Sequence, residues 1–352
     1  MRGNYIPVLI LVFLWFPLPV SRAFPVGIQT IQESLNLTPV VLKGEVLEID
    51  DLKQKESIFD NENALEQFGG KNKEAQIRVE SIIKGSSGSS TITVVFHDAM
   101  GPFTRLEKGR TYILFLSESQ HGLRLLDPCN GGIRVESGGG AGKETMPIKK
   151  MMRELEYSLN SKDEVILCTA ILGLAEIGSP ETRPRIRPFL EHKSEKVRTS
   201  AISACLRLGD WHLVTNAVNI CISPPLDRPQ LAGCLGLQSL DTFRSLTEGL
   251  GSVTNMEAVP VLVRAINQTS DKLVRQKLIE SLTNMQDERS VPLLLKLLRD
   301  GDSDVSFLAY RALAKMANIS YAGSHIFEGE RKRNEIEKLE RWSKERASRK
   351  FE

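Results

Sequence analysis

The sequence has little of what most enzymes and nucleic-acid-binding proteins display. Its five histidines are scattered over 352 residues, and none stands in an HExxH pattern. No GxSxG nucleophile turn is present either. The formal net charge is only +2, without the concentrated basic surface expected of a protein that binds nucleic acid. These absences favour a protein that is not an enzyme, has no catalytic, metal-binding or cofactor-binding residues, and does not bind nucleic acid.

Cysteine is scarce and poorly spaced for chemistry. The chain has five cysteines, an odd number, so at least one cannot pair within the molecule. No two are close enough for a CxxC unit, which argues against zinc binding. Cys168, Cys205 and Cys234 lie in apolar helical patterns, where a thiol packs as a small hydrophobe. We expect mostly free, buried thiols, and a disulfide between Cys205 and Cys234 is an alternative that spacing does not decide.

Long hydrophobic runs are missing except at the N-terminus. There, 15 apolar-rich residues from Ile6 to Val20 precede Ser21-Arg22-Ala23. This run is shorter than the roughly 20 residues that span a bilayer, and the small residues after it suit signal peptidase. We expect residues 1–23 to be a signal peptide, with a secreted or periplasmic location and no stable membrane insertion after cleavage. An uncleaved N-terminal anchor is the alternative.

Residues 24–136 show the alternation that predicts β-strands. Apolar residues recur at every second position and β-branched residues are frequent. Several short strands separated by turn signals indicate a small, closed, all-β structure. The expected strands are Val40–Ile49, Ala75–Gly85, Thr91–His97, Thr111–Leu116, Leu123–Leu126 and Ile133–Val135.

The order of these strands resembles the netrin-like, or tissue-inhibitor-of-metalloproteinase-like (TIMP-like), version of the OB barrel. The segments that carry the resemblance are VVLKGEVLEI from Val40, RVESIIKG from Arg78, LEKGRTYILFL from Leu106 and CNGGIRV from Cys129. The resemblance implies a binding module whose partner is unknown. Inhibitors in this family present an N-terminal cysteine to the protease zinc, whereas cleavage after Ala23 would expose Phe24. That departure makes metalloprotease inhibition an alternative only.

A glycine-rich segment, SGGGAGKET from Ser137 to Thr145, follows the last strand. It departs from a phosphate-binding loop, because Ser137 stands in the first glycine position and Glu144 replaces the hydroxyl that would reach magnesium. A carboxylate there would repel phosphate. We therefore predict that residues 137–146 are a flexible linker between two domains.

From Met146 onward the hydrophobic period changes to that of helices. Four polar residues each stand three positions before an aliphatic residue that opens an apolar helix: Asp163, Ser194, Asp271 and Asp302. Each can accept hydrogen bonds from the free N–H groups of a helix's first turn. The intervals from 163 to 194 and from 271 to 302 are both 31 residues. Self-similarity at this period, with two helices per unit, predicts an all-α superhelical solenoid over residues 147–326.

The partner helices carry a second signature. Pro184, Pro260 and Pro292 occupy matching places early in these helices, where proline is tolerated. Asp227 begins a looser copy of the repeat, 44 residues before Asp271. This long step predicts an insertion at residues 241–255.

The pattern D-x-x-V-R at Asp271 to Arg275, together with the VPLLLKLL helix, resembles HEAT repeats. The closest variety is the short class first described in phycobilisome lyases. The resemblance implies either a protein-binding scaffold or a bilin lyase-like, cofactor-handling enzyme. Lyases of this kind act inside the cell and lack a β-domain, so the scaffold is favoured.

A solenoid of this type presents an extended inner surface, formed by its second helices, to a protein or peptide partner. Cations that fall off the apolar stripe of those helices are the candidate partner-binding residues, although any one could simply be solvated: Arg198, Arg207, Arg275, Arg311 and Lys315. The sequence of residues 327–352 predicts a charged helix with i,i+4 ion pairs such as Glu337–Arg341. Its narrow stripe of Ile336, Leu339 and Trp342 could seal the last repeat.

Overall fold

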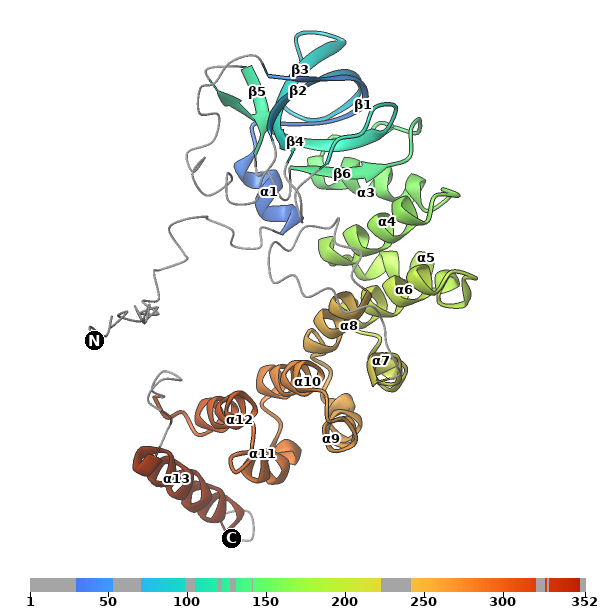
Figure 1. Cartoon of the computed structure of the whole chain (residues 1–352). Helices are drawn as coiled ribbons and strands as arrows, with labels where there is room; N and C mark the ends of the chain where they lie inside the picture. The colour runs from blue at the N-terminus through green and yellow to red at the C-terminus, as the bar shows by residue number, and fades with distance from the viewer. Residues whose placement is uncertain are drawn as a thin grey trace, which may run out of the picture.

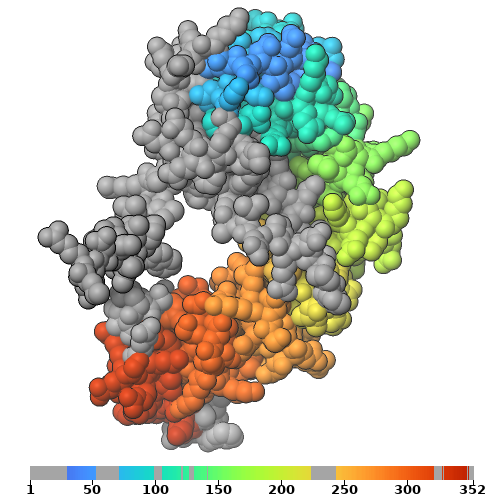
Figure 2. All heavy atoms as spheres, in the orientation of Figure 1, coloured from blue at the N-terminus to red at the C-terminus, as the bar shows by residue number. Residues whose placement is uncertain are grey.

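The computed structural model describes residues 30–52, 71–98, 105–119, 122–126, 131–140, 142–222, 242–320, 327 and 329–348. The predicted signal peptide, Cys129, Cys234 and the repeat copy at Asp227 lie outside the described residues. A β-barrel stands at one end, and helix pairs follow it along an arc to a long terminal helix (Figure 1; Figure 2 shows all heavy atoms in the same orientation). The two predicted fold classes, an all-β barrel and an all-α solenoid, are both confirmed.

All six predicted strands are present. They are β1 (Val40–Asp51), β2 (Lys71–Lys84), β3 (Thr91–Asp98), β4 (Thr111–Ser119), β5 (Gly122–Leu125) and β6 (Gly132–Val135). The strand order is β1-β2-β3-β5-β4-β6, and β1 also pairs with β4, so five strands close into a barrel and β6 extends β4. The β3–β5 pairing is parallel, whereas the other pairings are antiparallel. This closed order is that of an OB-like barrel.

The barrel wall is covered on both sides near its closure. Leu42 and Leu114 belong to the core inside the barrel. Their neighbours Val41, Ile113 and Phe115 belong to a second core that also contains helical residues. Strands buried on both faces are continuously apolar, which explains why VVL and YILFL interrupt the alternation.

The sequence analysis missed one helix, α1 (Ile31–Leu37), directly before β1. Its start is a capping box: the Thr30 hydroxyl accepts from the Glu33 N–H at 3.1 Å, and the Glu33 carboxylate accepts from the Thr30 N–H at 2.8 Å. The Thr-x-x-Glu spacing is visible in the sequence and could have predicted this helix.

The described residues of the solenoid form five helix pairs. The first helices are α3 (Pro147–Ser158), α5 (Arg183–Ile186, continued by a 3-10 turn to Glu191), α7 (Val214–Ile222), α9 (Val259–Gln268) and α11 (Val291–Leu297). The second helices are α4 (Glu164–Ile177), α6 (Glu195–Arg207), α8 (Thr242–Gly251), α10 (Lys272–Met285) and α12 (Ser303–Met316). The second helices contact one another in succession and line the inner side of the arc (Figure 1).

The predicted insertion at residues 241–255 is wrong. Helix α8 occupies residues 242–251 and packs between α6 and α10, so it is the second helix of the third pair. The hydroxyl of Ser281 on α10 donates to the Leu250 carbonyl of α8, and that of Ser203 on α6 donates to Ser245. The additional residues therefore lie between α7 and α8, because 47 residues separate the starts of α6 and α8.

The helix starts largely follow the predicted signatures. Asp163, Asp271 and Asp302 accept hydrogen bonds from first-turn N–H groups. Ser194 stands at the equivalent position of α6, but its side chain makes no capping bond within the described residues. Pro184, Pro260 and Pro292 all lie in the first turn of their helices, as predicted.

The core of the later helix pairs extends into the terminal helix. Terminal helix α13 (Gly329–Ser348) contributes buried Ile336 and Leu339, with Trp342 packed against them, and so covers the last pair. Cys168 and Cys205 are buried free thiols, and Cys221 is also buried. Burial raises the pKa of the Cys205 thiol to about 11, which keeps it protonated and unreactive at neutral pH. Among the described helices, none is long and apolar enough to cross a membrane.

The caps give a direct test of the repeat frame. We expect Asp302→Ala to lower the free energy of unfolding by about 1–2 kcal/mol, since two first-turn N–H groups lose their acceptor and the exposed ion pair with Lys272 is lost as well. Ser194→Ala is the matched control and should change stability by less than about 0.5 kcal/mol. Urea unfolding followed by circular dichroism measures both. Equal losses in the two variants would contradict the assignment of the caps.

Candidate functional site

The barrel and the first helix pair share one hydrophobic core. Val41, Ile113 and Phe115 from the barrel lie in the same buried cluster as Leu155 of α3 and Ile171 of α4. Helix α1 also belongs to this cluster through Ile31 and Leu35 and contacts both α3 and α4. The first repeat is therefore packed directly on the barrel wall.

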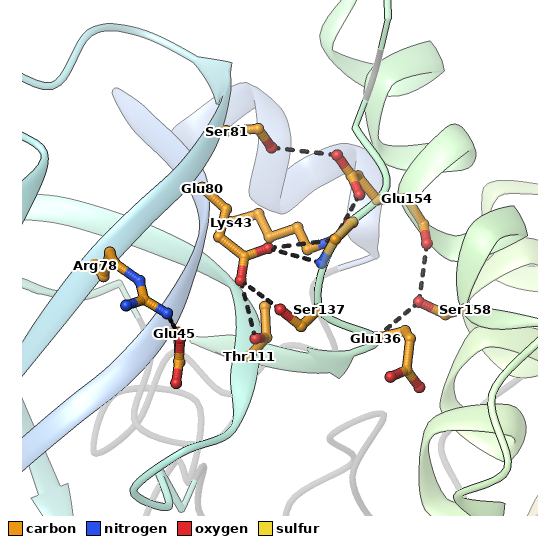
Figure 3. A network of polar contacts seen from close by, with 11 residues as sticks. Lys43, Glu45, Arg78, Glu80, Ser81, Thr111, Glu136, Ser137, Glu154 and Ser158 are labelled. Carbon is orange, nitrogen blue, oxygen red and sulfur yellow. Dashed lines mark hydrogen bonds and ion pairs between the residues drawn. The ribbon is translucent and has the colours of Figure 1, made fainter.

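A buried ion pair lies beside this shared core. Lys43 of β1 is 1% exposed and Glu154 of α3 is 0% exposed, and Lys43 Nζ lies 2.9 Å from Glu154 Oε2. The same ammonium lies 3.7 Å from Glu80 Oε2 of β2 and donates to the Gly138 carbonyl (Figure 3). Removing both charges from water costs several kcal/mol, which close pairing and additional hydrogen bonds must offset.

The two carboxylates have those additional partners (Figure 3). The Ser81 hydroxyl donates to Glu154 Oε1 at 3.2 Å. Glu80 accepts from the Ser137 hydroxyl at 2.8 Å and from the Gly138 N–H at 3.3 Å. The charged groups of the cluster are thus paired and hydrogen-bonded, and the cluster acts as a clamp between β1, β2 and α3.

The glycine-rich segment that was predicted to be a flexible linker completes this clamp. Gly138 and Gly139 both have a positive φ. A Cβ on Gly139 would lie 2.8 Å from the Tyr157 ring, so a side chain there would displace the tyrosine. The glycines allow residues 137–140 to lie flat between Tyr157 and the barrel.

A cavity of about 330 Å³ opens at this junction. Its lining residues are Lys43, Arg78, Glu80, Ser81, Ser137, Gly138, Gly139, Gly140 and Glu154. Arg78 forms an ion pair with Glu45 on the barrel surface. Since each charged group that lines the cavity already has a partner, the arrangement is that of a structural joint.

A second link joins the barrel to the repeat frame. The Arg134 guanidinium of β6 lies 2.8 Å from Asp163 Oδ2, while Asp163 Oδ1 accepts from the Val165 N–H at 2.9 Å. One carboxylate therefore caps α4 and holds the barrel at the same time.

The candidate partner-binding arginines Arg198 and Arg275 occupy the same repeat position, four residues after Ser194 and Asp271. Arg198 Nη1 donates to the carbonyls of His192 and Lys193 at 2.8 and 2.9 Å. The Arg275 guanidinium pairs with Asp300 in the turn before α12. Both side chains are used to hold neighbouring turns, so the structure gives them a role within the repeat.

The other three candidates lie further along the second helices. Arg207 ends α6 and Lys315 stands in the last turn of α12, while Arg311 is one turn earlier. Arg207 and Arg311 are half-buried and Lys315 is exposed.

The 31-residue period places a continuous surface on α10 and α12. We call it the inner stripe, and it consists of Leu273, Lys277, Glu280 and Asn284 on α10 and Asp304, Leu308, Arg311 and Lys315 on α12. All eight side chains are exposed or half-buried. Only Arg311 and Lys315 were predicted from the sequence. The positions one repeat of 31 residues before Arg311 and Lys315 are Glu280 and Asn284, so the period could have predicted these two residues as well.

The clamp predicts a large, non-additive effect on stability. Lys43→Met leaves a buried Glu154 charge without its cation and should cost about 3–5 kcal/mol in urea unfolding. Lys43→Met/Glu154→Gln should recover a substantial part of that loss. Lys71→Met breaks an exposed pair with Asp51 and serves as the control, with an expected change under about 1 kcal/mol. Simple additivity of the two clamp substitutions would contradict the coupling.

The link between Arg275 and Asp300 predicts a pH dependence. The hydrogen bond from Arg275 lowers the pKa of the Asp300 carboxyl below its ordinary value. Its stabilisation is therefore complete above the ordinary aspartate pKa of about 3.9 and disappears as pH falls through the lowered pKa. The stability difference between wild type and Asp300→Asn, measured by urea unfolding, should be constant from pH 7 to 5 and shrink toward pH 3. A constant difference down to pH 3 would contradict this role.

The family of HEAT repeats matches residues 152–219 and 241–318. The second range begins one residue before α8 and so agrees with its place in the stack. No curated protein matches the chain in sequence.

Several solved helical proteins are similar over part of the chain. An engineered protein is 18% identical, covering 55% of this chain and 94% of its own, with a TM-score of 0.33. A designed armadillo repeat protein is 15% identical, covering 54% and 98%, with a TM-score of 0.33. A second engineered protein is 19% identical, covering 58% and 61%, with a TM-score of 0.32. The repeat assignment rests on the family match and on the capped, stacked helices: residues 152–219 and 241–318 match HEAT repeats and belong to a helical-repeat region that is joined to a small five-stranded β-barrel.

Proposed function

We propose that the protein is an exported, non-enzymatic scaffold that holds a protein partner on the inner stripe of its HEAT repeats. The observation that carries this proposal is the stripe itself. Leu273 is 38% exposed and lies among charged and polar side chains. An apolar anchor with a polar surround is the usual composition of a protein-binding surface.

The barrel adds a second surface at a fixed position. The barrel shares a core with α3 and α4 and is held to α3 by Lys43 and Glu154. A partner that contacts both the barrel and the solenoid therefore binds two surfaces in a fixed relative orientation. A rigid arrangement of this kind reduces the entropy that is lost on binding.

The alternatives have less support. Metalloprotease inhibition by a netrin-like or TIMP-like barrel requires an N-terminal segment that reaches the protease zinc. Here the N–H of Ile31, seven residues after the expected new N-terminus at Phe24, donates to Glu176 Oε1 at 2.7 Å. This contact ties the start of α1 to the solenoid. The bilin lyase-like alternative is weakened by the expected export signal and by the barrel, which those lyases lack.

Capture of partners from the native extracellular or periplasmic fraction tests the scaffold. The test variant is Leu273→Glu/Asn284→Glu, two exposed positions of the inner stripe. The control is Met256→Glu/Asn267→Glu, which likewise replaces one apolar side chain and one asparagine by glutamate, at exposed positions on and beside the outer helix α9. We expect the first variant to lose most of the partner recovered by mass spectrometry and the control to retain it.

Equal recovery by both variants would contradict the use of this stripe. Urea unfolding of the two variants confirms that each remains folded, so that a loss of partner is read as a loss of binding.

A further inference from the structure

The cations of α10 and α12 divide into two groups. Lys272 lies 2.7 Å from Asp304 and 3.2 Å from Asp302, and Lys277 lies 3.0 Å from Glu280. Arg275, as described, pairs with Asp300. In contrast, Arg311 and Lys315 have no carboxylate partner among the residues that the structure describes. The positive charge at the end of the inner stripe is therefore not neutralised by that part of the chain.

These two cations are placed to act together. They are four residues apart on α12, so they lie one helical turn apart on the same face. Arg311 is half-buried, whereas Lys315 is exposed. A partly desolvated guanidinium binds an anion more strongly than one that is fully in water.

A pocket of about 390 Å³ adjoins Lys315. It is lined by Ala314, Lys315, Asn318, Ile319 and Ser320. The chain turns sharply here, because Asn318 adopts a φ of 55° and the Ile319 N–H donates to the Ala314 carbonyl at 2.9 Å. The pocket thus combines one ammonium group, one amide and one hydroxyl with two apolar side chains.

We propose that this end of the inner stripe binds carboxylates of an acidic peptide segment in the partner protein. The inference rests on the scaffold function proposed above and specifies the chemistry of its partner. An arginine fork and a lysine point charge match one or two carboxylates, and the neutral donors of the pocket can bind the adjoining peptide groups.

A peptide fits this surface better than a nucleic acid. Glu280 and Asp304 lie on the same inner stripe as the two cations. Nucleic acid requires a continuous row of cations along its phosphates, whereas Lys272 and Lys277 of α10 are already paired with Asp304 and Glu280. A short acidic segment needs only the two cations Arg311 and Lys315, which have no carboxylate partner in the described part of the chain.

Fluorescence polarisation on the full chain tests the inference. The probes are the fluorescein-labelled decapeptides (Gly-Glu)5 and (Gly-Gln)5. We expect only the acidic probe to bind, with an affinity that falls as salt is added. Arg311→Gln/Lys315→Gln should weaken binding about tenfold or more, equivalent to about 1.4 kcal/mol.

The matched control is Arg264→Gln/Lys296→Gln, which removes two exposed cations from the outer helices α9 and α11. It should change the affinity less than about twofold, since it alters only the general attraction between charges. Equal weakening by the two double variants would overturn the site. Equal binding of the two peptides, or tighter binding of a labelled (dT)10 oligonucleotide through the same two residues, would also overturn it.

The two proposals can fail separately. If (Gly-Glu)5 does not bind while Leu273→Glu/Asn284→Glu still abolishes partner capture, the carboxylate site is rejected and the scaffold function stands. If neither peptide binds and capture does not depend on the inner stripe, both are rejected.

Discussion

The buried contact between Lys43 and Glu154 fixes the direction in which the solenoid leaves the barrel. Lys43 belongs to the barrel wall and Glu154 to α3, a helix of the first pair, from which the later pairs follow in succession. Hydrophobic contact between two surfaces tolerates some sliding, because it has no direction. A buried ion pair does not, since an uncompensated charge would cost several kcal/mol. The polar clamp therefore specifies an orientation that the shared hydrophobic core stabilises.

The shared core also explains why the barrel is not an independent unit. Val41 and Phe115 would be exposed on the outer wall of an isolated barrel, yet both are buried here against α1, α3 and α4. The glycine-rich segment crosses the junction without separating its two sides, because Gly138 is hydrogen-bonded to Lys43 and Glu80. The barrel and the solenoid are therefore held in a fixed orientation relative to each other.

Local signals in the sequence predicted most elements and left the long-range contacts unknown. Strands, capped helices and first-turn prolines depend on neighbouring residues, and they were predicted well. Helix α8 was misplaced because it is not preceded by the Asp-x-x-Val frame of the other repeats. From the sequence alone, Lys43 is predicted to be a solvent-exposed strand residue. Its partner Glu154 is 111 residues away, and no local pattern indicates the ion pair. The predicted cations Arg198 and Arg275 could not be distinguished from Arg311 and Lys315 without the positions of the turns.

Comparing equivalent positions in successive repeats distinguishes the residues that stabilise the stack from those that are available to a partner. Arg198 and Arg275 occupy the same repeat position; Arg198 binds the preceding turn and Arg275 binds the following one. At the same position of α12, the Ser306 hydroxyl donates to the Leu298 carbonyl at 2.6 Å. Each of these side chains therefore makes contacts within the stack. Arg311 corresponds instead to Glu280 in the preceding pair, so its charge is not required for stacking. A charge that differs from its counterpart in the neighbouring repeat and has no partner in the described residues, as at Arg311, is therefore available for binding.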